Sequence, residues 1–256
     1  MYLKNVINDP SFLELFLQSR DLPQNYGFRL DARVVEIPWA LARLKTREGY
    51  LLDAGSSLNH EVILASSPLS NKKIAITTLG PEGECHWQRS ISYIFGDLRN
   101  MDFRDNLFDI VVCISTIEHI GMDNSMYVKQ GNIAKRSGSK DFLIAIRELS
   151  RVLKPGGVLY CTFPFGKYED HGWFQQFDSS LAEELIKEFH PTYYRETVFK
   201  YDPDGWKISD RKSCAECEFF DVHNSKYFDP NSTLEYPPDY PAGERAVLCL
   251  ELFKQP

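Results

Sequence analysis

Short apolar runs alternate with amphipathic stretches along most of this chain. The runs predict strands at 50–53, 73–79 and 92–95, at 110–114, at 158–163, and late in the chain at about 193–201 and 246–253. Ile110 to Ile114 is apolar at every position, which is typical of a strand covered on both faces. Strands separated by helical crossovers predict an α/β fold built on a mostly parallel sheet.

The segment 107–166 carries the clearest pattern. Its central helix has an apolar stripe of helical period and ends at Pro155-Gly156-Gly157, where another strand begins. In parallel sheets, ligands bind at the carboxyl ends of the strands. Ser115, Glu118, His119 and the turn 164–166 fall at such ends, so we look for the functional site there.

The remaining helices suggest how the chain is organised. Helices are predicted at 11–20, with Ser11 as N-cap and Glu14 completing a capping box, and at 33–46, 58–66 and 179–189. We expect a single domain over 1–256. Residues 1–47 would form an N-terminal helical cover, and 202–245 an insertion between the last two strands, ordered because it is rich in aromatic residues.

Composition narrows the class of protein. The 256 residues carry a formal charge of -7, so the chain lacks the excess of basic residues that is typical of proteins binding nucleic acid or an anionic membrane surface. No apolar run approaches the ~20 residues of a spanning helix, and the N-terminus lacks a secretory pattern. Six scattered cysteines do not resemble a disulfide framework. These features predict a cytoplasmic protein.

Four motifs lie on or next to the predicted strands, and together they resemble the class I S-adenosylmethionine-dependent methyltransferases. The motifs are Asp53-Ala-Gly55-Ser-Ser57, Gly96-Asp97-Leu98, Phe108-Asp109 through His119, and Leu149 through Gly157. The resemblance implies a Rossmann-like fold, a seven-stranded, mostly parallel sheet with helices on both faces, and S-adenosylmethionine as cofactor. It assigns cofactor binding to Asp53, Gly55, Ser56, Ser57, Asp97, Leu98 and Ser115.

Within that superfamily, the chain is most similar to uncharacterised bacterial methyltransferase-like proteins, through Ser115–Gly121 and Pro164-Phe165-Gly166. It departs from the family pattern at two positions. Ser57 replaces the second glycine of the first motif, and Gly80 stands where a carboxylate normally holds the ribose hydroxyls. Glu82 or Glu84 could reach the ribose instead.

The acceptor is expected to be a small molecule or a saccharide, held by the loops 118–140 and 165–177. His119 and His171 are the candidate catalytic bases, because a histidine near neutral pKa suits that role. Acceptor contacts are predicted from Glu118, Tyr168, Asp170 and Trp173. Cys214, Cys217 and His223 lack a second cysteine pair at zinc spacing, so no metal site is expected.

Two other functions are compatible with the pattern. The departures at Ser57 and Gly80 would suit a non-catalytic binding module on a decayed methyltransferase scaffold. A nucleotide-cofactor oxidoreductase is less favoured, because the chain lacks a pyrophosphate-binding loop.

Overall fold

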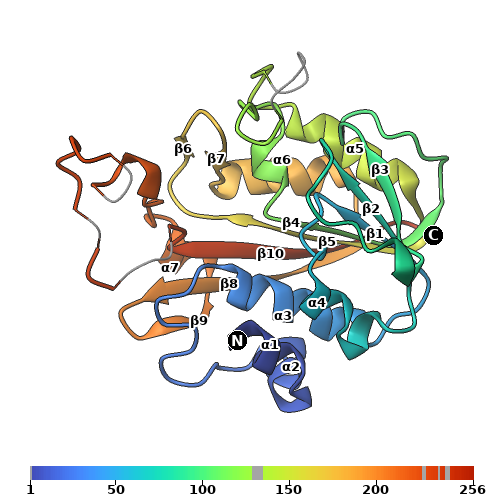
Figure 1. Cartoon of the computed structure of the whole chain (residues 1–256), viewed down its shortest axis with the longest axis horizontal. Coiled ribbons are helices and arrows are strands. Elements are labelled where there is room, and N and C mark those ends of the chain that lie inside the picture. The colour runs from blue at the N-terminus through green and yellow to red at the C-terminus, as the bar shows by residue number, and fades with distance from the viewer. Residues whose placement is uncertain (1, 129–134, 227–228, 236, 240–242) are drawn as a thin grey trace.

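The computed structural model describes residues 2–128, 135–226, 229–235, 237–239 and 243–256. Its centre is an eight-stranded sheet of order β3-β2-β1-β4-β5-β10-β8-β9 (Figure 1). The first five strands in that order are parallel, and β10 runs antiparallel to both of its neighbours. The strands are β1 (Tyr50–Ala54), β2 (Lys73–Thr78), β3 (Ser92–Phe95), β4 (Phe108–Ile114), β5 (Leu153–Pro164), β8 (Tyr193–Asp202), β9 (Gly205–Ser209) and β10 (Ala246–Phe253).

Helices cover both faces of this sheet. In Figure 1, α1 to α4 lie on one face, and α5 and α6 lie on the other. Two short strands, β6 (Glu169–Asp170) and β7 (Gln175–Gln176), form a separate ribbon. The helices are α1 (Tyr2–Ile7), α2 (Pro10–Leu17), α3 (Arg33–Leu44), α4 (Glu61–Leu64), α5 (Phe142–Val152), α6 (Ser179–Phe189) and α7 (Arg211–Cys214). Within the described ranges, no helix has the length and apolar character needed to cross a bilayer.

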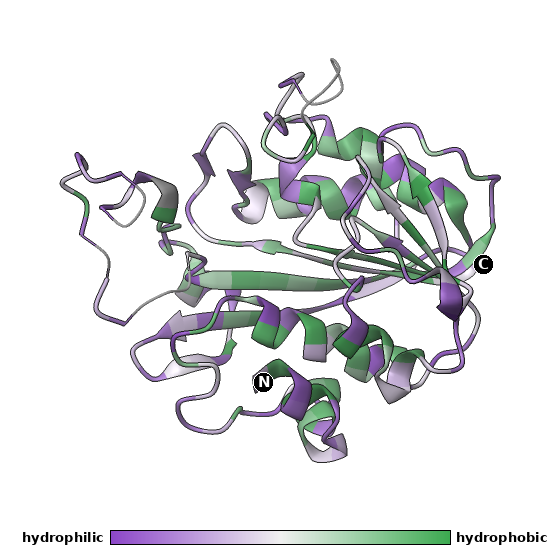
Figure 2. Ribbon diagram, in the orientation of Figure 1, coloured by the Kyte–Doolittle hydropathy of each residue, from purple (hydrophilic) through white to green (hydrophobic). Residues whose placement is uncertain are grey.

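The core is two apolar layers separated by the sheet. Alternate residues of one strand enter opposite layers: Ile110 and Val112 pack with α1 to α4, whereas Val111 and Cys113 pack with α5 and α6. This follows from the period of two along a strand. Figure 2 shows hydrophobic residues in the strands of the sheet and on the helices that flank it. The predicted α/β fold with a mostly parallel, two-faced sheet is therefore confirmed.

The number of strands and several element ends differ from the predictions. The sheet has eight strands because β9, within the segment predicted as an insertion, turns back and pairs with β8. Helix α2 is capped by Asp9, whose carboxylate accepts the Ser11 N–H, so Ser11 is not the N-cap. The helix predicted at 58–66 shrinks to α4 followed by a 3-10 turn at Ser67–Leu69. Helix α1 had no clear apolar period and was missed.

A buried ion pair joins the N-terminal helices to the far half of the sheet. Arg43 of α3 donates from Nε to Glu251 of β10 at 2.8 Å, and both residues are buried. The guanidinium also donates to the carbonyl oxygens of Phe16 and Trp39 and lies 4.4 Å from the Trp39 ring centroid. Because the Arg43 guanidinium is buried away from water, the fold would be destabilised if Glu251, its charged partner, were removed.

We therefore expect Glu251→Ala to lower the free energy of unfolding by about 3–5 kcal/mol, the usual loss when one partner of a buried pair is removed. Urea unfolding followed by circular dichroism measures this. Glu184→Ala is the control, because it removes the carboxylate from the exposed pair that Glu184 makes with Lys140. A loss no larger in Glu251→Ala than in Glu184→Ala would contradict the assignment.

Candidate functional site

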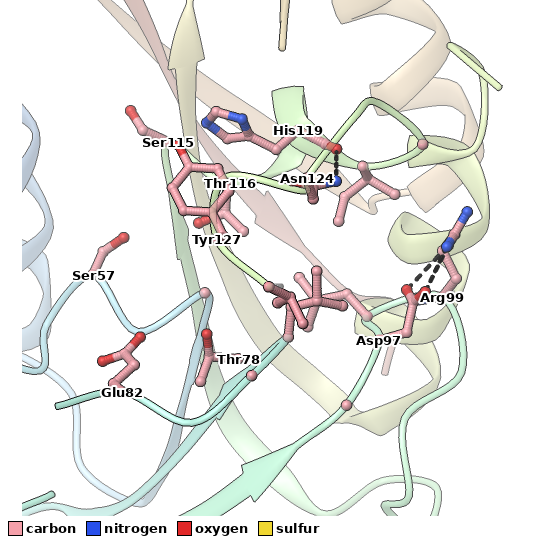
Figure 3. Close-up of a pocket in the computed structure, with 18 of the residues that line it drawn as sticks. Ser57, Thr78, Glu82, Asp97, Arg99, Ser115, Thr116, His119, Asn124 and Tyr127 are labelled. Carbon is pink, nitrogen blue, oxygen red and sulfur yellow. Dashed lines mark hydrogen bonds and ion pairs between the residues drawn. The ribbon is translucent and has the colours of Figure 1, made fainter. Parts of the chain in front are cut away.

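A cleft of about 310 Å³ opens at the carboxyl ends of β1, β2, β3 and β4. Figure 3 shows Glu82 and Ser57 on one side of it, Asp97 and Arg99 on another, and His119 with Tyr127 on a third. All four strand ends contribute because parallel strands finish at the same edge of the sheet. The lining residues are Arg33, Gly55, Ser57, Thr78, Leu79, Gly80, Pro81, Glu82, Gly96, Asp97, Leu98, Arg99, Ser115, Thr116, His119, Ile120, Gly121, Asn124, Tyr127 and Val128.

The turn after β1 packs directly on the end of β4. Gly55 has a φ of +110°, and a Cβ there would lie 2.1 Å from Thr116 Oγ1. Ser57 donates its hydroxyl to the Ile114 carbonyl at 2.6 Å. Gly55 is thus required by backbone conformation and by the approach of the β4 turn, before any ligand is considered.

Asp53 and Ser56 lie behind the lining residues. The Asp53 carboxylate is fully buried and accepts the Leu58 N–H at 2.8 Å, which holds the turn closed. Burial raises the pKa of Asp53 to about 7. Ser56 donates its hydroxyl to Glu82 at 2.6 Å. These two side chains shape the cleft without lining it.

Glu82 brings a carboxylate to the cleft beside Gly80. Its Oε2 accepts from Ser56 and from Asn59 Nδ2 at 2.9 Å. Oε1 has no hydrogen-bond partner among the described residues. Of the two acids named from the sequence, Glu82 lines the cleft, whereas the exposed Glu84 does not.

At the end of β3, Asp97 is engaged by a neighbouring cation. Arg99 donates to both carboxylate oxygens of Asp97 and also to Asp141 at 2.7 Å. These two acids raise the pKa of Arg99, chiefly through the hydrogen bonds with Asp97. Leu98 is buried and lines the cleft between them. This end of the cleft therefore combines an apolar wall with a fixed ion pair.

His119 has a defined hydrogen-bond state. Its Nδ1 lies 3.0 Å from the Trp173 carbonyl oxygen, and a carbonyl can only accept, so Nδ1 carries the proton. Nε2 is then left with its lone pair. Burial lowers the pKa of His119 to about 4, which keeps the ring neutral at ordinary pH. The ring is also bounded by Tyr127, whose centroid is 5.5 Å away.

An acid-rich cluster lies beside His119. Ser115 and Thr162 each donate a hydroxyl to Glu36 Oε1 at 2.6 Å, and Arg33 donates to Glu36 Oε2 at 3.1 Å. Ser115 therefore lines the cleft while its hydroxyl points to α3. Glu118 is buried, and its Oε2 has no hydrogen-bond partner among the described residues. Burial raises the pKa of Glu118 well above its ordinary value.

The loop after β5 lies beside the cleft rather than in it. Trp173 contacts His119, with ring centroids 5.3 Å apart. Asp170 forms an ion pair with Arg136, Tyr168 is exposed, and neither lines the cleft. His171 stacks on Phe174 with centroids 4.4 Å apart, and it too lies outside the cleft lining. Part of the other predicted acceptor loop, 129–134, lies outside the described residues.

Several lining residues were not singled out from the sequence, although Asn124 and Tyr127 lie in the loop 118–140 that was predicted to hold the acceptor. Arg33 belongs to α3, more than eighty residues before the end of β4. The sequence pattern around it predicts a helix but gives no indication of a contact with the cleft. Tyr127 and Asn124 lie in a polar loop without regular pattern. Asn124 donates to the His119 carbonyl at 2.9 Å and so holds this loop against the β4 turn. The described residues contain no cluster able to hold a metal ion, and the His223 side chain lies outside them.

Comparisons with known proteins match part of this chain to a methyltransferase family. Residues 69–161 match the family described as "Methyltransferase domain". A demethylmenaquinone methyltransferase of Staphylococcus haemolyticus is 30% identical over 83 residues, 32% of this chain and 26% of that protein. An uncharacterized protein of Methanocaldococcus jannaschii is 24% identical over 145 residues, 57% of this chain and 45% of that protein. The chain thus aligns with less than half the length of either relative.

Two solved structures share the fold. One belongs to a Haloferax volcanii complex that contains the Trm112 methyltransferase activator, with a TM-score of 0.50, 15% identity, and coverage of 86% of this chain and 89% of that chain. The other is the Burkholderia thailandensis 1,6-didemethyltoxoflavin-N1-methyltransferase, which contains S-adenosylhomocysteine. It has a TM-score of 0.50 and 12% identity, and it covers 99% of this chain and 88% of that chain.

The β1 turn yields a stability prediction. Gly55→Ala should lower the free energy of unfolding by about 1–3 kcal/mol more than Gly156→Ala, because it adds overpacking against Thr116 to the strain of a positive φ. Gly156 has a φ of +73° with open space where a Cβ would lie, so it isolates the backbone effect. Urea unfolding of the two variants is the measurement. Equal losses would show that the Thr116 contact is unimportant.

Proposed function

We propose that this chain, whose residues 69–161 match a methyltransferase-domain family, is a class I S-adenosylmethionine-dependent methyltransferase that transfers a methyl group to a small-molecule or saccharide-type acceptor. The observation that carries the proposal is that Gly55, Glu82, Asp97 and His119, from four different strand ends, line one cleft. When bound, the cofactor supplies an electrophilic methyl group on a sulfonium. The proposal includes a cytoplasmic location and no nucleic-acid partner, both of which rest on composition.

The cleft can be divided by the chemistry of its walls. We assign the adenine to the end formed by Asp97 and Leu98, where an acid and an apolar wall meet. The turn 55–57 would hold the amino-acid part, because its backbone is exposed to the cleft. We assign the ribose to Glu82, whose Oε1 can accept hydrogen bonds from hydroxyl groups. Asp53 would act indirectly, by closing the turn.

The acceptor would enter beside His119, Tyr127 and Arg33. His119 presents a neutral nitrogen with a free lone pair, as a general base requires. Its low pKa makes it a weak base, so it suits an acceptor that is itself fairly acidic, such as a phenol or an enol. Much of the rate enhancement would come from aligning the acceptor with the methyl group. The proton would pass from the acceptor to Nε2 of His119.

Two of the matched proteins favour a small acceptor. Their names specify demethylmenaquinone and 1,6-didemethyltoxoflavin, which are small organic molecules. The aromatic side chain of Tyr127, which lines the cleft next to His119, would suit a planar ring. A saccharide face could stack there as well, so both acceptor classes belong in the first activity screen.

The cofactor assignment is tested by titrating S-adenosylhomocysteine in a calorimeter. Glu82→Gln should weaken binding roughly 10- to 100-fold, because a charge-assisted hydrogen bond is worth about 1.5–3 kcal/mol. Glu84→Gln, two residues along the same exposed segment, should bind as tightly as the unmodified protein. Gly80→Asp should gain little, because Glu82 already supplies a carboxylate.

The outcomes of that titration separate the alternatives. Absence of binding by the unmodified protein at millimolar ligand would remove the methyltransferase proposal and favour a decayed scaffold. Equal affinities for the Glu82 and Glu84 variants would leave the cofactor proposal intact and reject Glu82 as the ribose contact.

Catalysis is tested with radiolabelled S-adenosylmethionine and an acceptor found by screening. His119→Ala should lower turnover by ~10²–10⁴ while the affinity for S-adenosylhomocysteine stays unchanged, because only the proton acceptor is lost. His171→Ala is the matched control, since His171 lies outside the cleft lining. Turnover should also fall as the pH drops through about 4, where His119 becomes protonated. Near-normal turnover in His119→Ala would exclude it as the base.

A further inference from the structure

Two cysteines outside the cleft form a contacting thiol pair. Cys214 ends α7, and the Cys217 N–H donates to the Cys214 carbonyl at 3.0 Å, so the chain makes one tight turn between them. Cys214 is fully buried, whereas Cys217 is partly exposed. Two residues separated by a single turn of this kind fall in the range of Cα separations that a disulfide can bridge.

The two thiols differ in pKa, which is lowered for Cys217 and raised for Cys214. A hydrogen bond from Cys214 lowers the pKa of Cys217 to about 7, with help from the positive charges of Lys200 and Arg245. The same hydrogen bond and burial raise the pKa of Cys214. Cys217 is therefore the partly exposed thiol that ionises, and Cys214 is the thiol held in contact with it. Reactive cysteines typically have this combination of exposure and positive surroundings.

A second thiol pair in the same chain provides a contrast. Cys113 and Cys161 are register partners on the adjacent strands β4 and β5, and their side chains also interact. Both are fully buried, so no external reagent can reach them in the folded protein. The two pairs share thiol contact and differ in access to solvent.

The backbone around Cys217 is held in place. Its carbonyl accepts the Lys167 N–H at 3.0 Å and the Gln176 side chain at 2.8 Å. A Cβ on Gly166 would lie 2.1 Å from that same carbonyl oxygen. These contacts hold the backbone of Cys217 against the turn after β5. The segment that carries the two cysteines is therefore already ordered before a disulfide forms between them.

We propose that Cys214 and Cys217 form a redox-active dithiol that exchanges with low-molecular-weight disulfides. The Cys217 thiolate attacks one sulfur of the small disulfide, that S–S bond breaks, and one thiolate leaves. Cys214 then attacks Cys217 Sγ, gives up its proton, and releases the second small thiol. The protein dithiol is oxidised to a disulfide, and the small disulfide is reduced to two thiols.

The pair is also connected to the proposed catalytic side. Phe219, two residues after Cys217, packs on Phe174 with ring centroids 4.5 Å apart, and Phe174 lies 6.0 Å from the His119 ring. The dithiol is thus linked to His119 through a series of contacts between aromatic rings. The dithiol proposal itself does not depend on methyl transfer.

The experiment uses the full chain, reduced and desalted, then incubated with glutathione disulfide. Free thiols are blocked with N-ethylmaleimide after acid quenching and denaturation, and tryptic peptides are analysed by mass spectrometry. Cleavage after Lys212 and Lys226 places both cysteines on one peptide, 213–226. We expect that peptide to be lighter than its reduced form by two hydrogens and to carry no N-ethylmaleimide, whereas Cys113 and Cys161 remain labelled. Treatment with dithiothreitol before labelling should restore both labels on the peptide.

Variants identify the order of the steps. Cys214→Ser should accumulate glutathione on Cys217, because the resolving thiol is missing. Cys217→Ser should leave Cys214 unmodified, because it is buried. Cys85, which is partly exposed, is the internal control for general reactivity. Full labelling of the 213–226 peptide in the unmodified protein, or oxidation of Cys85 as readily as the pair, would overturn the proposal whether or not the variants fold.

Discussion

The cleft depends on one constraint, the reversal of strand order at the centre of the sheet. From β1 the sheet extends through β2 to β3 on one side and through β4 to β5 on the other. The connections on the two sides separate at this point, so the chain leaves a crevice above the carboxyl ends of β1 and β4. Because both faces of the sheet are covered by helices, this edge is where polar ligand-binding groups can gather with the least disturbance of the core.

Close contact between the β1 and β4 turns follows from that arrangement. Gly55 allows Thr116 to pack against the backbone. Ser57, which stands where the methyltransferase motif has its second glycine, donates a hydrogen bond to the Ile114 carbonyl. The departure at Ser57 therefore has a structural role of its own. It gives less support to a decayed scaffold than the sequence suggested, because the hydroxyl joins the two strand ends that form the cleft.

A buried carboxylate joins the N-terminal helices to the same edge. Glu36 accepts hydrogen bonds from Ser115 and Thr162, at the ends of β4 and β5, and pairs with Arg33. Three donors compensate for the cost of burying this charge. Glu118 lies nearby without such donors, and burial raises its pKa. Burial is also what lowers the pKa of the neighbouring His119 and keeps its ring neutral, with a smaller contribution from the positive charge of Arg33.

The sequence determined the features that depend on local pattern. Apolar runs located the main strands, and the residues after each strand pointed to the edge of the sheet where the cleft opens. The predicted turn at Pro155-Gly156-Gly157 was wrong in position, because α5 ends at Val152 and these three residues lie within β5. The strands and the edge could be predicted because strand period and helix period are properties of neighbouring residues.

Only the tertiary structure decided how side chains far apart in the chain pair. It placed Glu82 rather than Glu84 in the cleft and directed Asp170 to Arg136. It also brought Glu36 to Ser115 across 79 positions. Such pairings depend on how the crossovers pack against the sheet, and periodicity along the chain carries no information about the partner on another element.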